Sequence, residues 1–277
     1  MSGPPNHKND GFVIAFCDPG CKLQPKFRYF WKPFPHGPVI SQFTYSGTEL
    51  DAVAEAHNYY DWIIDAFAGS LGERIIEAGA GIGTVAERLL KRPSTRELLL
   101  IEPASNNIPE LQRKFGRDPR VRIFQGYLEE IGDSFPADTI IAVNVMEHIE
   151  RDADFVRAAQ RRLSRDGSLL LLVPAVPAIY GSLDRAFDHF RRYTKPGLKK
   201  LLTDAGFEIQ RLQYVNMIGV AAWFLSGRVM RRTTLGRAQV RFYDRWVIPW
   251  LRRIESKIQP PIGQSLLAIA RKPLPAR

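Results

Sequence analysis

Three glycines spaced two residues apart follow an apolar run and precede a helix-like segment in "IIEAGAGIGTVAERLL", residues 75–90. A strand that enters such a loop and leaves it as a helix points free backbone N–H groups, and the positive end of a helix dipole, at whatever lies over the loop. Glycine also lets a ligand approach the backbone where a Cβ atom would collide with it. The stretch is therefore either a nucleotide-binding loop or a tight turn that packs closely.

Short apolar segments alternate with helix-like segments on both sides of this glycine loop. A first helix is expected at 48–69, where Thr48 and Asp51 stand at capping-box spacing and Gly69 supplies a stop. Further strands are expected at 73–77, 97–102, 121–124, 138–144 and 168–173, and further helices at 83–92, 107–115 and 152–164. This alternation predicts an α/β fold, with a parallel sheet covered by helices on both faces.

The two ends of the chain depart from this alternation. Residues 1–47 contain many prolines and aromatic side chains, which predicts an irregular N-terminal arm. Near the other end, Thr194 caps a helix that Gly206 ends, and 207–215 and 265–272 have the pattern of strands. If these two strands pair, residues 216–264 form a helical insertion at the edge of a core made of residues 48–215 and 265–277.

The glycine spacing and a nearby acidic residue narrow the choice of ligand. The common dinucleotide fingerprint has its third glycine three positions after the second, but that position holds Thr84. The chain instead has an E-x-G-x-G-x-G pattern, made of Glu77, Gly79, Gly81 and Gly83. This pattern resembles motif I of the class I S-adenosylmethionine-dependent methyltransferases. The resemblance implies that these four residues bind the cofactor S-adenosyl-L-methionine.

The second expected strand ends at an acidic residue, Glu102. A carboxylate there would lie at the carboxyl edge of the sheet beside the glycine loop, where it could accept both hydroxyls of a ribose. In the family resembled, an acidic residue at this place binds the cofactor ribose, so the resemblance assigns that role to Glu102. A solvated surface charge is the alternative for a lone glutamate.

Two later segments extend the resemblance. "FQGYLEEI", residues 124–131, resembles the segment with which the family contacts adenine, but Tyr127 stands where the family often has aspartate. Backbone groups of Tyr127 and Leu128 are therefore expected to replace the acidic contact. "IIAVNVMEHIE", residues 140–150, resembles the family's fourth strand and places Asn144 and Val145 near the methionine moiety of the cofactor.

The resemblance also completes the predicted fold class. It implies a seven-stranded, mostly parallel sheet with helices on both faces. The last strand would be antiparallel, in a hairpin with the sixth, and the helical insertion would precede it.

Two histidines are candidates for proton transfer. Methyl transfer to a hydroxyl or an amine requires the acceptor to lose a proton, and histidine is the usual proton acceptor near neutral pH. His148 and His189 follow the fourth and fifth parallel strands, in loops that open at the carboxyl edge of the sheet. We favour His189 as the base, with Tyr180, Arg191 and Tyr193 around the acceptor. The alternatives are that His148 only holds its loop and that His189 is a plain surface residue.

The formal net charge of +10 has much of its excess late in the chain. Residues 216–264 interleave arginine with aromatic side chains such as Trp246 and Trp250, so an anionic lipid surface or an acidic ligand competes with a nucleic acid as the partner. A solvated basic face is the plain alternative. We expect this insertion and the arm to form the acceptor pocket, while a dimer surface or ordinary packing helices would explain the same composition.

Composition and the shortness of the apolar runs favour a cytoplasmic protein. The chain is 45% hydrophobic and 25% charged, as in ordinary globular proteins. Its first residues lack the apolar region of a signal peptide, and its apolar runs fall short of the roughly 18 residues of a membrane span. Peripheral membrane association and a homodimer stay open. Cys17 and Cys21 provide too few ligands for a zinc site, so no metal is expected.

These features together predict an S-adenosylmethionine-dependent methyltransferase that acts on a small, apolar or lipid-like acceptor, with O-methylation favoured over N- or C-methylation. The charge makes a nucleic-acid methyltransferase or an RNA-binding protein one alternative, although no Asn/Asp-Pro-Pro-Tyr type motif is present. A non-catalytic scaffold that keeps the cofactor fold is the other alternative. The intact glycine loop and Glu102 argue against it.

Overall fold

The computed structural model describes residues 43–45, 49–132 and 135–274. All of them belong to Phe34–Arg277, the larger of the two units into which the chain divides. The predicted N-terminal arm, residues 1–47, therefore lies almost entirely outside the described residues, and so do Cys17 and Cys21.

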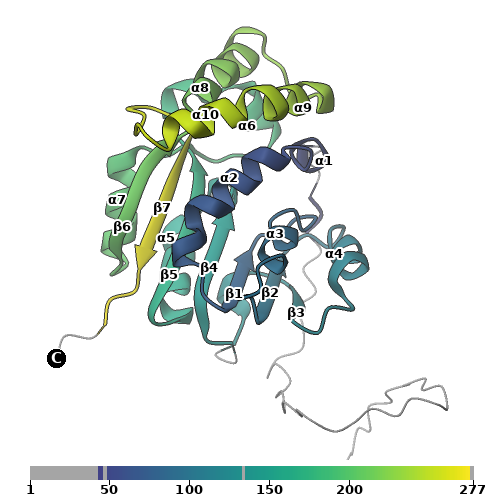
Figure 1. The fold of residues 1–277 in the computed structure, drawn as a ribbon, viewed down its shortest axis with the longest axis vertical. Coiled ribbons are helices and arrows are strands. Elements are labelled where there is room, and N and C mark those ends of the chain that lie inside the picture. Colours follow the sequence, from purple (N-terminus) through teal and green to yellow (C-terminus); the bar gives the residue numbers. More distant parts are fainter. Residues whose placement is uncertain (1–42, 46–48, 133–134, 275–277) are drawn as a thin grey trace, which may run out of the picture. The chain divides into compact units, whose positions relative to one another are not determined.

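Seven strands of the described chain form one sheet, in the order β3-β2-β1-β4-β5-β7-β6 (Figure 1). The strands are β1 (Arg74–Ala78), β2 (Glu97–Glu102), β3 (Val121–Gln125), β4 (Ala137–Val143), β5 (Leu163–Pro174), β6 (Glu208–Val215) and β7 (Ser265–Arg271). β1 to β5 pair in parallel, and β7 runs antiparallel between β5 and β6. This arrangement confirms the predicted fold class.

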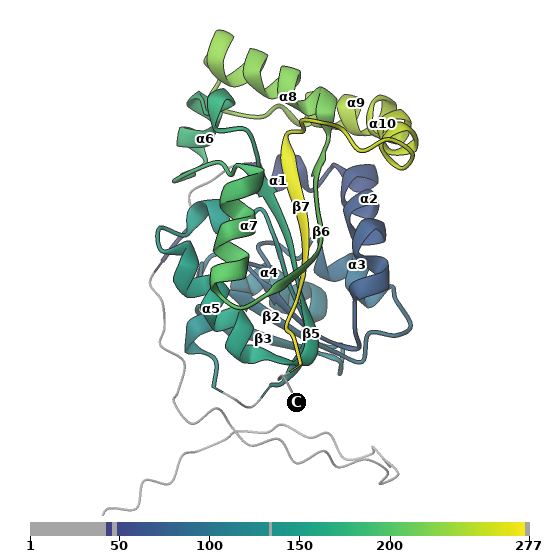
Figure 2. The same cartoon turned by 90° about the vertical axis from the view of Figure 1, so that its left-hand side faces the viewer.

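Helices cover both faces of the sheet because successive strand residues point to opposite sides. Ile75 belongs to the core cluster on one face and Ile76 to the cluster on the other, and both side chains are fully buried. The first face packs against α2 (His57–Phe67), α3 (Ala86–Leu90) and α4 (Ile108–Phe115), and the second against α5 (Asp152–Arg162) and α7 (Lys195–Asp204) (Figure 2).

The strand order creates a crevice between β1 and β4. The chain runs outward from β1 through β2 to β3 and then returns to the other side of β1 to form β4. In parallel sheets such a reversal separates the loops at the carboxyl ends of the two strands, and ligands bind there. The glycine loop follows β1 and therefore opens at this place.

The helix predicted at 48–69 is two helices, α1 (Glu49–Val53) and α2, which is a correction of the prediction. Asp244, on α9 (Arg237–Trp246), explains the break. Its carboxylate accepts hydrogen bonds from the backbone N–H groups of Asn58 (3.0 Å) and Tyr59 (2.8 Å). The first N–H groups of a helix have no partner inside it, so a carboxylate at this place stabilises a helix start.

Two other boundaries differ from the prediction. α3 begins at Ala86 rather than at 83, because the glycine loop continues as a tight turn in which Gly83 has a φ of +85°. α5 ends at Arg162 and β5 begins directly at Leu163, earlier than the expected 168.

The segment between β6 and β7 is helical and lies across the carboxyl end of the sheet (Figures 1 and 2). It contains α8 (Met217–Phe224), a π-helical turn over residues 225–229, α9 and α10 (Ile248–Glu255). Ile248 and Leu251 of α10 are buried in the core cluster that also includes α2. Among the described residues, none of the helices combines the length and the apolar character needed to cross a membrane.

Candidate functional site

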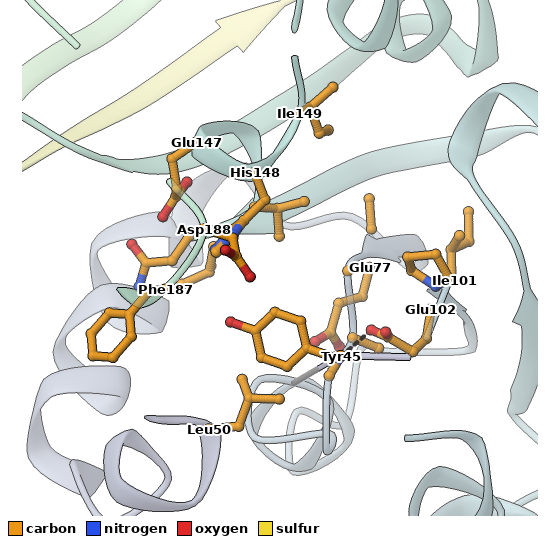
Figure 3. A pocket seen from close by; sticks show the side chains of 18 of the residues that line it. Tyr45, Leu50, Glu77, Ile101, Glu102, Glu147, His148, Ile149, Phe187 and Asp188 are labelled. Atoms are coloured by element: carbon orange, nitrogen blue, oxygen red, sulfur yellow. Dashed lines mark hydrogen bonds between the residues drawn. The ribbon is translucent and has the colours of Figure 1, made fainter. Parts of the chain in front are cut away.

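A cavity of about 770 Å³ lies at the carboxyl end of β1, β2 and β4. Its volume lies within the range of small-molecule sites, roughly 300–1,000 Å³. In Figure 3, Glu77 and Glu102 lie on one side of the cavity and Glu147 and His148 on the other, with Tyr45 between them. The cavity therefore joins the predicted cofactor residues to the predicted catalytic histidines.

The glycine loop combines both roles considered for it from the sequence. Gly79 and Gly81 line the cavity with φ angles of +72° and +54°, a region that L side chains rarely adopt. A Cβ atom on Gly81 would have its nearest neighbour at 3.7 Å, in Leu50, so the backbone there is open to a ligand. Gly83 instead packs closely, since a Cβ atom on it would lie 2.3 Å from Phe115 Cε2. Gly83 is not among the lining residues.

Glu102 is fixed against the glycine loop. Its Oε2 accepts a hydrogen bond from the N–H of Gly81 (2.7 Å), and its Oε1 accepts one from the N–H of Ala104 (2.9 Å). Burial raises the pKa of the Glu102 carboxyl, and these backbone hydrogen bonds act in the opposite direction. The carboxylate is thus held at the cavity wall, with lone pairs left to accept the hydroxyls of a ribose.

Glu77 lies beside Glu102, and one of its two carboxyl oxygens, Oε2, has no polar partner among the described residues. The side chain is buried. Burial, and then the neighbouring Glu102, raise the pKa of Glu77 well above its usual range. Two carboxyl groups at one end of a cavity fit a cationic ligand, because a positive charge would favour the ionised form of both. S-adenosylmethionine carries an ammonium and a sulfonium group and meets this requirement.

The remaining predicted cofactor residues, Tyr127, Leu128, Asn144 and Val145, also line the cavity. Asn144 has a φ of +54°, a conformation that asparagine tolerates better than most residues. The backbone N–H of Tyr127 already donates to Glu130 Oε2 (2.8 Å). Of the two residues predicted to contact adenine through the backbone, Tyr127 therefore already uses its N–H group within the protein.

His189 lines the cavity and is supported by a buried carboxylate. His189 Nδ1 lies 3.1 Å from Asp184 Oδ1, and the Asp184 side chain is fully buried. Asp184 comes from α6 (Ser182–Ala186) and also accepts hydrogen bonds from Arg192 Nε (2.6 Å) and Trp223 Nε1 (3.0 Å). Burial opposes ionisation of Asp184, but these donors outweigh it and lower its pKa. An ionised Asp184 would stabilise a protonated His189.

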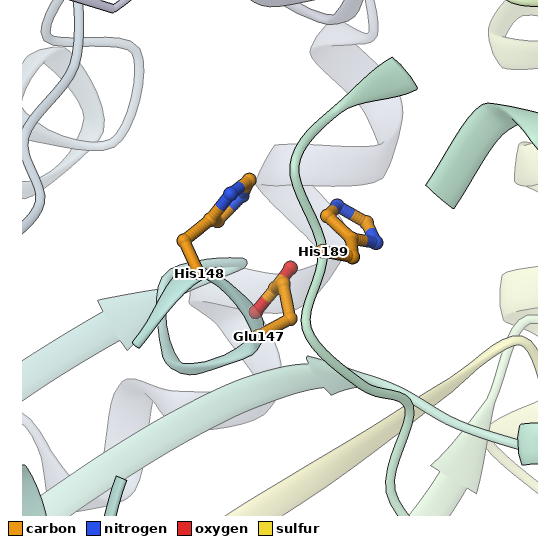
Figure 4. A group of neighbouring side chains, drawn as sticks. All are labelled: Glu147, His148 and His189. Carbon is orange, nitrogen blue, oxygen red and sulfur yellow. The ribbon is translucent and has the colours of Figure 1, made fainter. Parts of the chain in front are cut away.

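Glu147 and His148 lie next to His189 (Figure 4). The two imidazole rings meet edge to face with their centroids 4.8 Å apart, and the Glu147 carboxyl lies beside them. Burial, and then His189, lower the pKa of His148 to about 3, so this ring stays neutral at pH 7. Burial raises the pKa of Glu147 to about 7, and its Oε2 has no hydrogen-bond partner within the described chain. Sequence reasoning missed Glu147, although it directly precedes His148.

The same three side chains could also hold a metal ion. Their ligand atoms all lie within 4.8 Å of one another, and two histidines with a carboxylate suit a divalent transition metal. The sequence predicted no metal. The prediction rested on the cysteines, which carry no information about this group.

The residues predicted to contact the acceptor do not line the cavity. The Tyr180 hydroxyl donates to the backbone carbonyl of His189 (2.7 Å). Arg191 binds the carbonyl of Glu150 (2.6 Å), and the Tyr193 hydroxyl donates to Asp152 Oδ2 (2.8 Å). We therefore assign these three residues to holding the loop that carries His189. The cavity wall is instead completed by Phe187, Arg192, Trp223 and Leu235, the last two from the helical segment between β6 and β7.

The sequence profile of the methyltransferase domain matches residues 52–212, more than half of the chain. The chain belongs to the methyltransferase domain family. S-adenosylmethionine is the cofactor, as the glycine loop predicted. The matched residues include the glycine loop, Glu102 and both histidines.

Two curated relatives match about half of this methyltransferase. One, from Paracidovorax citrulli, is named ubiquinone biosynthesis O-methyltransferase and is 22% identical over 147 residues, which are 48% of this chain and 62% of the relative. The other, from Mycobacterium tuberculosis, is named as an S-adenosylmethionine-dependent methyltransferase and is 27% identical over 136 residues, 48% of each chain. The chain thus spans between about half and three fifths of the length of these relatives.

A solved structure supports the fold. The cyclopropane synthase MmaA2 from Mycobacterium tuberculosis superposes with a TM-score of 0.52 at 18% identity, covering 76% of this chain and 82% of the synthase. At this identity the likeness concerns the fold alone.

Replacing Glu102 by glutamine is expected to weaken binding of S-adenosylmethionine. The carboxylate offers charged acceptors for the ribose hydroxyls, and hydrogen bonds to a charged group contribute about 1.5–3 kcal/mol, so the dissociation constant should rise about ten- to a hundredfold. Titration calorimetry with the cofactor measures it. Glu208→Gln, on the exposed start of β6, is the matched control and should bind as the wild type does. An unchanged affinity in Glu102→Gln would remove this residue from the cofactor site.

Proposed function

We propose that this methyltransferase transfers a methyl group to a hydroxyl of a small, apolar or lipid-like acceptor, with His189 taking the hydroxyl proton. One observation carries the proposal: His189, backed by the buried carboxylate of Asp184, lines the same cavity as the glycine loop and Glu102. Bound S-adenosylmethionine supplies a methyl group on a sulfonium, so the chain has to position the acceptor and accept its proton.

His189 is the better base of the two histidines. Nδ1 of His189 faces Asp184, which leaves Nε2 to take a proton. His148 has a pKa of about 3 and would hold a proton poorly at neutral pH. Glu147, with a pKa of about 7, is suited to relay a proton away from this group.

The character of the cavity wall supports an apolar acceptor. Phe187, Phe190, Trp223 and Leu235 bring aromatic and aliphatic surface to the cavity, and the Phe187 ring lies beside that of His189. Arg192 also lines the cavity, but its guanidinium is bound to Asp184. The name of the Paracidovorax citrulli relative, ubiquinone biosynthesis O-methyltransferase, agrees with this class of acceptor.

Tracing the labelled methyl group tests the proposed acceptor class. The full chain is incubated with S-adenosylmethionine labelled in its methyl group and with either a bacterial lipid extract or total RNA. We expect label in the organic phase of the lipid incubation, in a product that resists mild acid as an ether does. Label that appears only in RNA would overturn the lipid-like acceptor and favour a nucleic-acid methyltransferase.

Chelation separates a proton-transfer role from a metal role at the group of Glu147, His148 and His189. Because we assign these side chains to handling a proton, dialysis against EDTA is expected to leave the initial rate of methyl transfer unchanged. Elemental analysis of the same sample gives the metal content. A loss of rate that added Zn²⁺ or Mn²⁺ restores would instead make these residues metal ligands.

A further inference from the structure

The helical segment between β6 and β7 carries most of the exposed apolar side chains. Of the sixteen large hydrophobic side chains that the described chain exposes, twelve lie in residues 216–264. They include Trp246 and Trp250, which are 58% and 64% exposed. Apolar side chains gathered in this way on one segment mark an interaction surface.

The charged side chains that this segment exposes are all basic. It contains nine arginines and lysines and two acidic residues, Asp244 and Glu255. Both acidic side chains are buried and accept hydrogen bonds from backbone N–H groups. Asp244 accepts them at the start of α2, and Glu255 accepts them from Asn216 (2.9 Å) and Met217 (2.8 Å). The segment therefore exposes basic groups and none of its own carboxylates.

The apolar and basic side chains are interleaved along α9 and α10. Phe242, Trp246, Trp250, Ile254 and Ile258 recur at every fourth position, and all five are at least half exposed. The Arg245 guanidinium lies 5.4 Å from the centre of the Trp246 ring, and that of Arg253 lies 5.5 Å from the centre of the Trp250 ring. We call these seven side chains the α9–α10 face.

The arginines of the segment divide into two groups. Arg237 and Arg252 pair with Asp51 (2.9 Å) and Asp65 (2.6 Å), so they attach the segment to α1 and α2. Arg245 and Arg253, in contrast, form no ion pair with any carboxylate of the described residues, and both are exposed. The two arginines of the α9–α10 face are therefore free to meet an anionic partner.

We propose that the α9–α10 face docks the protein on a membrane surface rich in anionic lipids. Tryptophan rings favour the level of the lipid headgroups, and arginines beside them attract anionic lipids. A second copy of the chain fits less well, because a symmetric contact through this face would bring like charges together. A nucleic acid would use the arginines but would leave the isoleucines without a partner.

Docking there would place the cavity close to the lipids. Trp223 on α8 and Leu235, between α8 and α9, line the cavity, while the adjoining residues Phe224 and Leu225 are about half exposed. The segment thus contributes Trp223 and Leu235 to the cavity, while its exposed side chains would contact the membrane. The docking proposal does not depend on the acceptor proposed above. Its test measures binding to lipid vesicles, so it can fail or succeed whatever molecule receives the methyl group.

Vesicle sedimentation with the full chain tests the proposal. Vesicles of phosphatidylcholine alone are compared with vesicles of phosphatidylcholine and phosphatidylglycerol. We expect the protein to bind the anionic vesicles at least tenfold more strongly, and added salt to weaken that binding. Equal binding to both vesicles, or none, would overturn the proposal.

Two variants locate the contact. Arg245→Glu/Arg253→Glu should lower the partition coefficient more than tenfold, and Trp246→Ser/Trp250→Ser should lower it as well. The matched control, Arg161→Glu/Lys199→Glu, makes the same change of charge at exposed positions of α5 and α7 and should bind as the wild type does. Circular dichroism checks that each variant is folded.

Equal losses of vesicle binding in the control and in the α9–α10 variants would show that net charge, and not this face, drives binding. Light scattering gives the oligomeric state of each protein. If the wild type is a dimer and the tryptophan variant is a monomer, the α9–α10 face binds a second copy of the chain and not a membrane.

Discussion

Replacing His189 by alanine is expected to lower kcat for methyl transfer by about 10²–10⁴-fold, the usual contribution of a general base. Affinity for S-adenosylmethionine should stay near that of the wild type, because His189 hydrogen-bonds to Asp184, whereas Glu102 is held by the glycine loop. Turnover of the labelled cofactor and titration calorimetry measure the two quantities separately. Added imidazole should restore part of the rate by filling the space that the side chain leaves.

The pH dependence distinguishes a base from a residue that only shapes the cavity. At alkaline pH hydroxide from the solvent can remove the acceptor's proton without His189, so the difference in rate between wild type and His189→Ala should shrink as the pH rises. A purely structural role would leave the ratio constant. His148→Ala should lose less activity, since His148 holds a proton poorly, and His57→Gln, at the exposed start of α2, should keep the full rate. Full turnover in His189→Ala, with both ligands bound, would remove His189 as the base.

The parts of the fold that could be predicted are those encoded by neighbouring residues. The apolar run "ELLLIE" fixes both the strand β2 and the place of Glu102, because the last residue of a parallel strand lies at the carboxyl edge whatever surrounds it. The glycine loop is equally local, since positive φ angles at Gly79 and Gly81 follow from the turn. These residues therefore line the cavity as the sequence predicted.

The parts that could not be predicted depend on contacts between distant residues. The break between α1 and α2 requires Asp244, which lies 186 residues after Asn58. The support of His189 requires Trp223, 39 residues after Asp184, and the sequence gives no signal that the two meet. Similarly, "FDHFRRYT" contains several polar side chains, and their residue types do not tell which of them faces the cavity. His189 lines it, whereas Tyr193 turns toward Asp152.

Replacing Asp184 by alanine is expected to lower the free energy of unfolding by about 3–5 kcal/mol, because removing one member of a buried ion pair leaves the other charge without compensation. Arg192 is that other member, and its side chain is fully buried. Trp223 and the N–H of Gly181 would lose their acceptor in the same substitution. Urea unfolding followed by circular dichroism measures the change. Asp204→Ala removes an exposed ion pair with Lys200 and should cost at most about 1 kcal/mol.

A double substitution and a pH series make this prediction specific to the ion pair. Asp184→Ala/Arg192→Met removes both charges, so it should recover a large part of the lost stability. Because the folded protein lowers the pKa of Asp184, its contribution is complete above the ordinary aspartate pKa of about 3.9 and is lost as the pH falls through the lowered value. The difference between wild type and Asp184→Ala should therefore be constant near neutral pH and shrink in acid. A loss no larger than that of Asp204→Ala, or one that does not depend on Arg192, would show that this network does not stabilise the site through the pairing of the two charges.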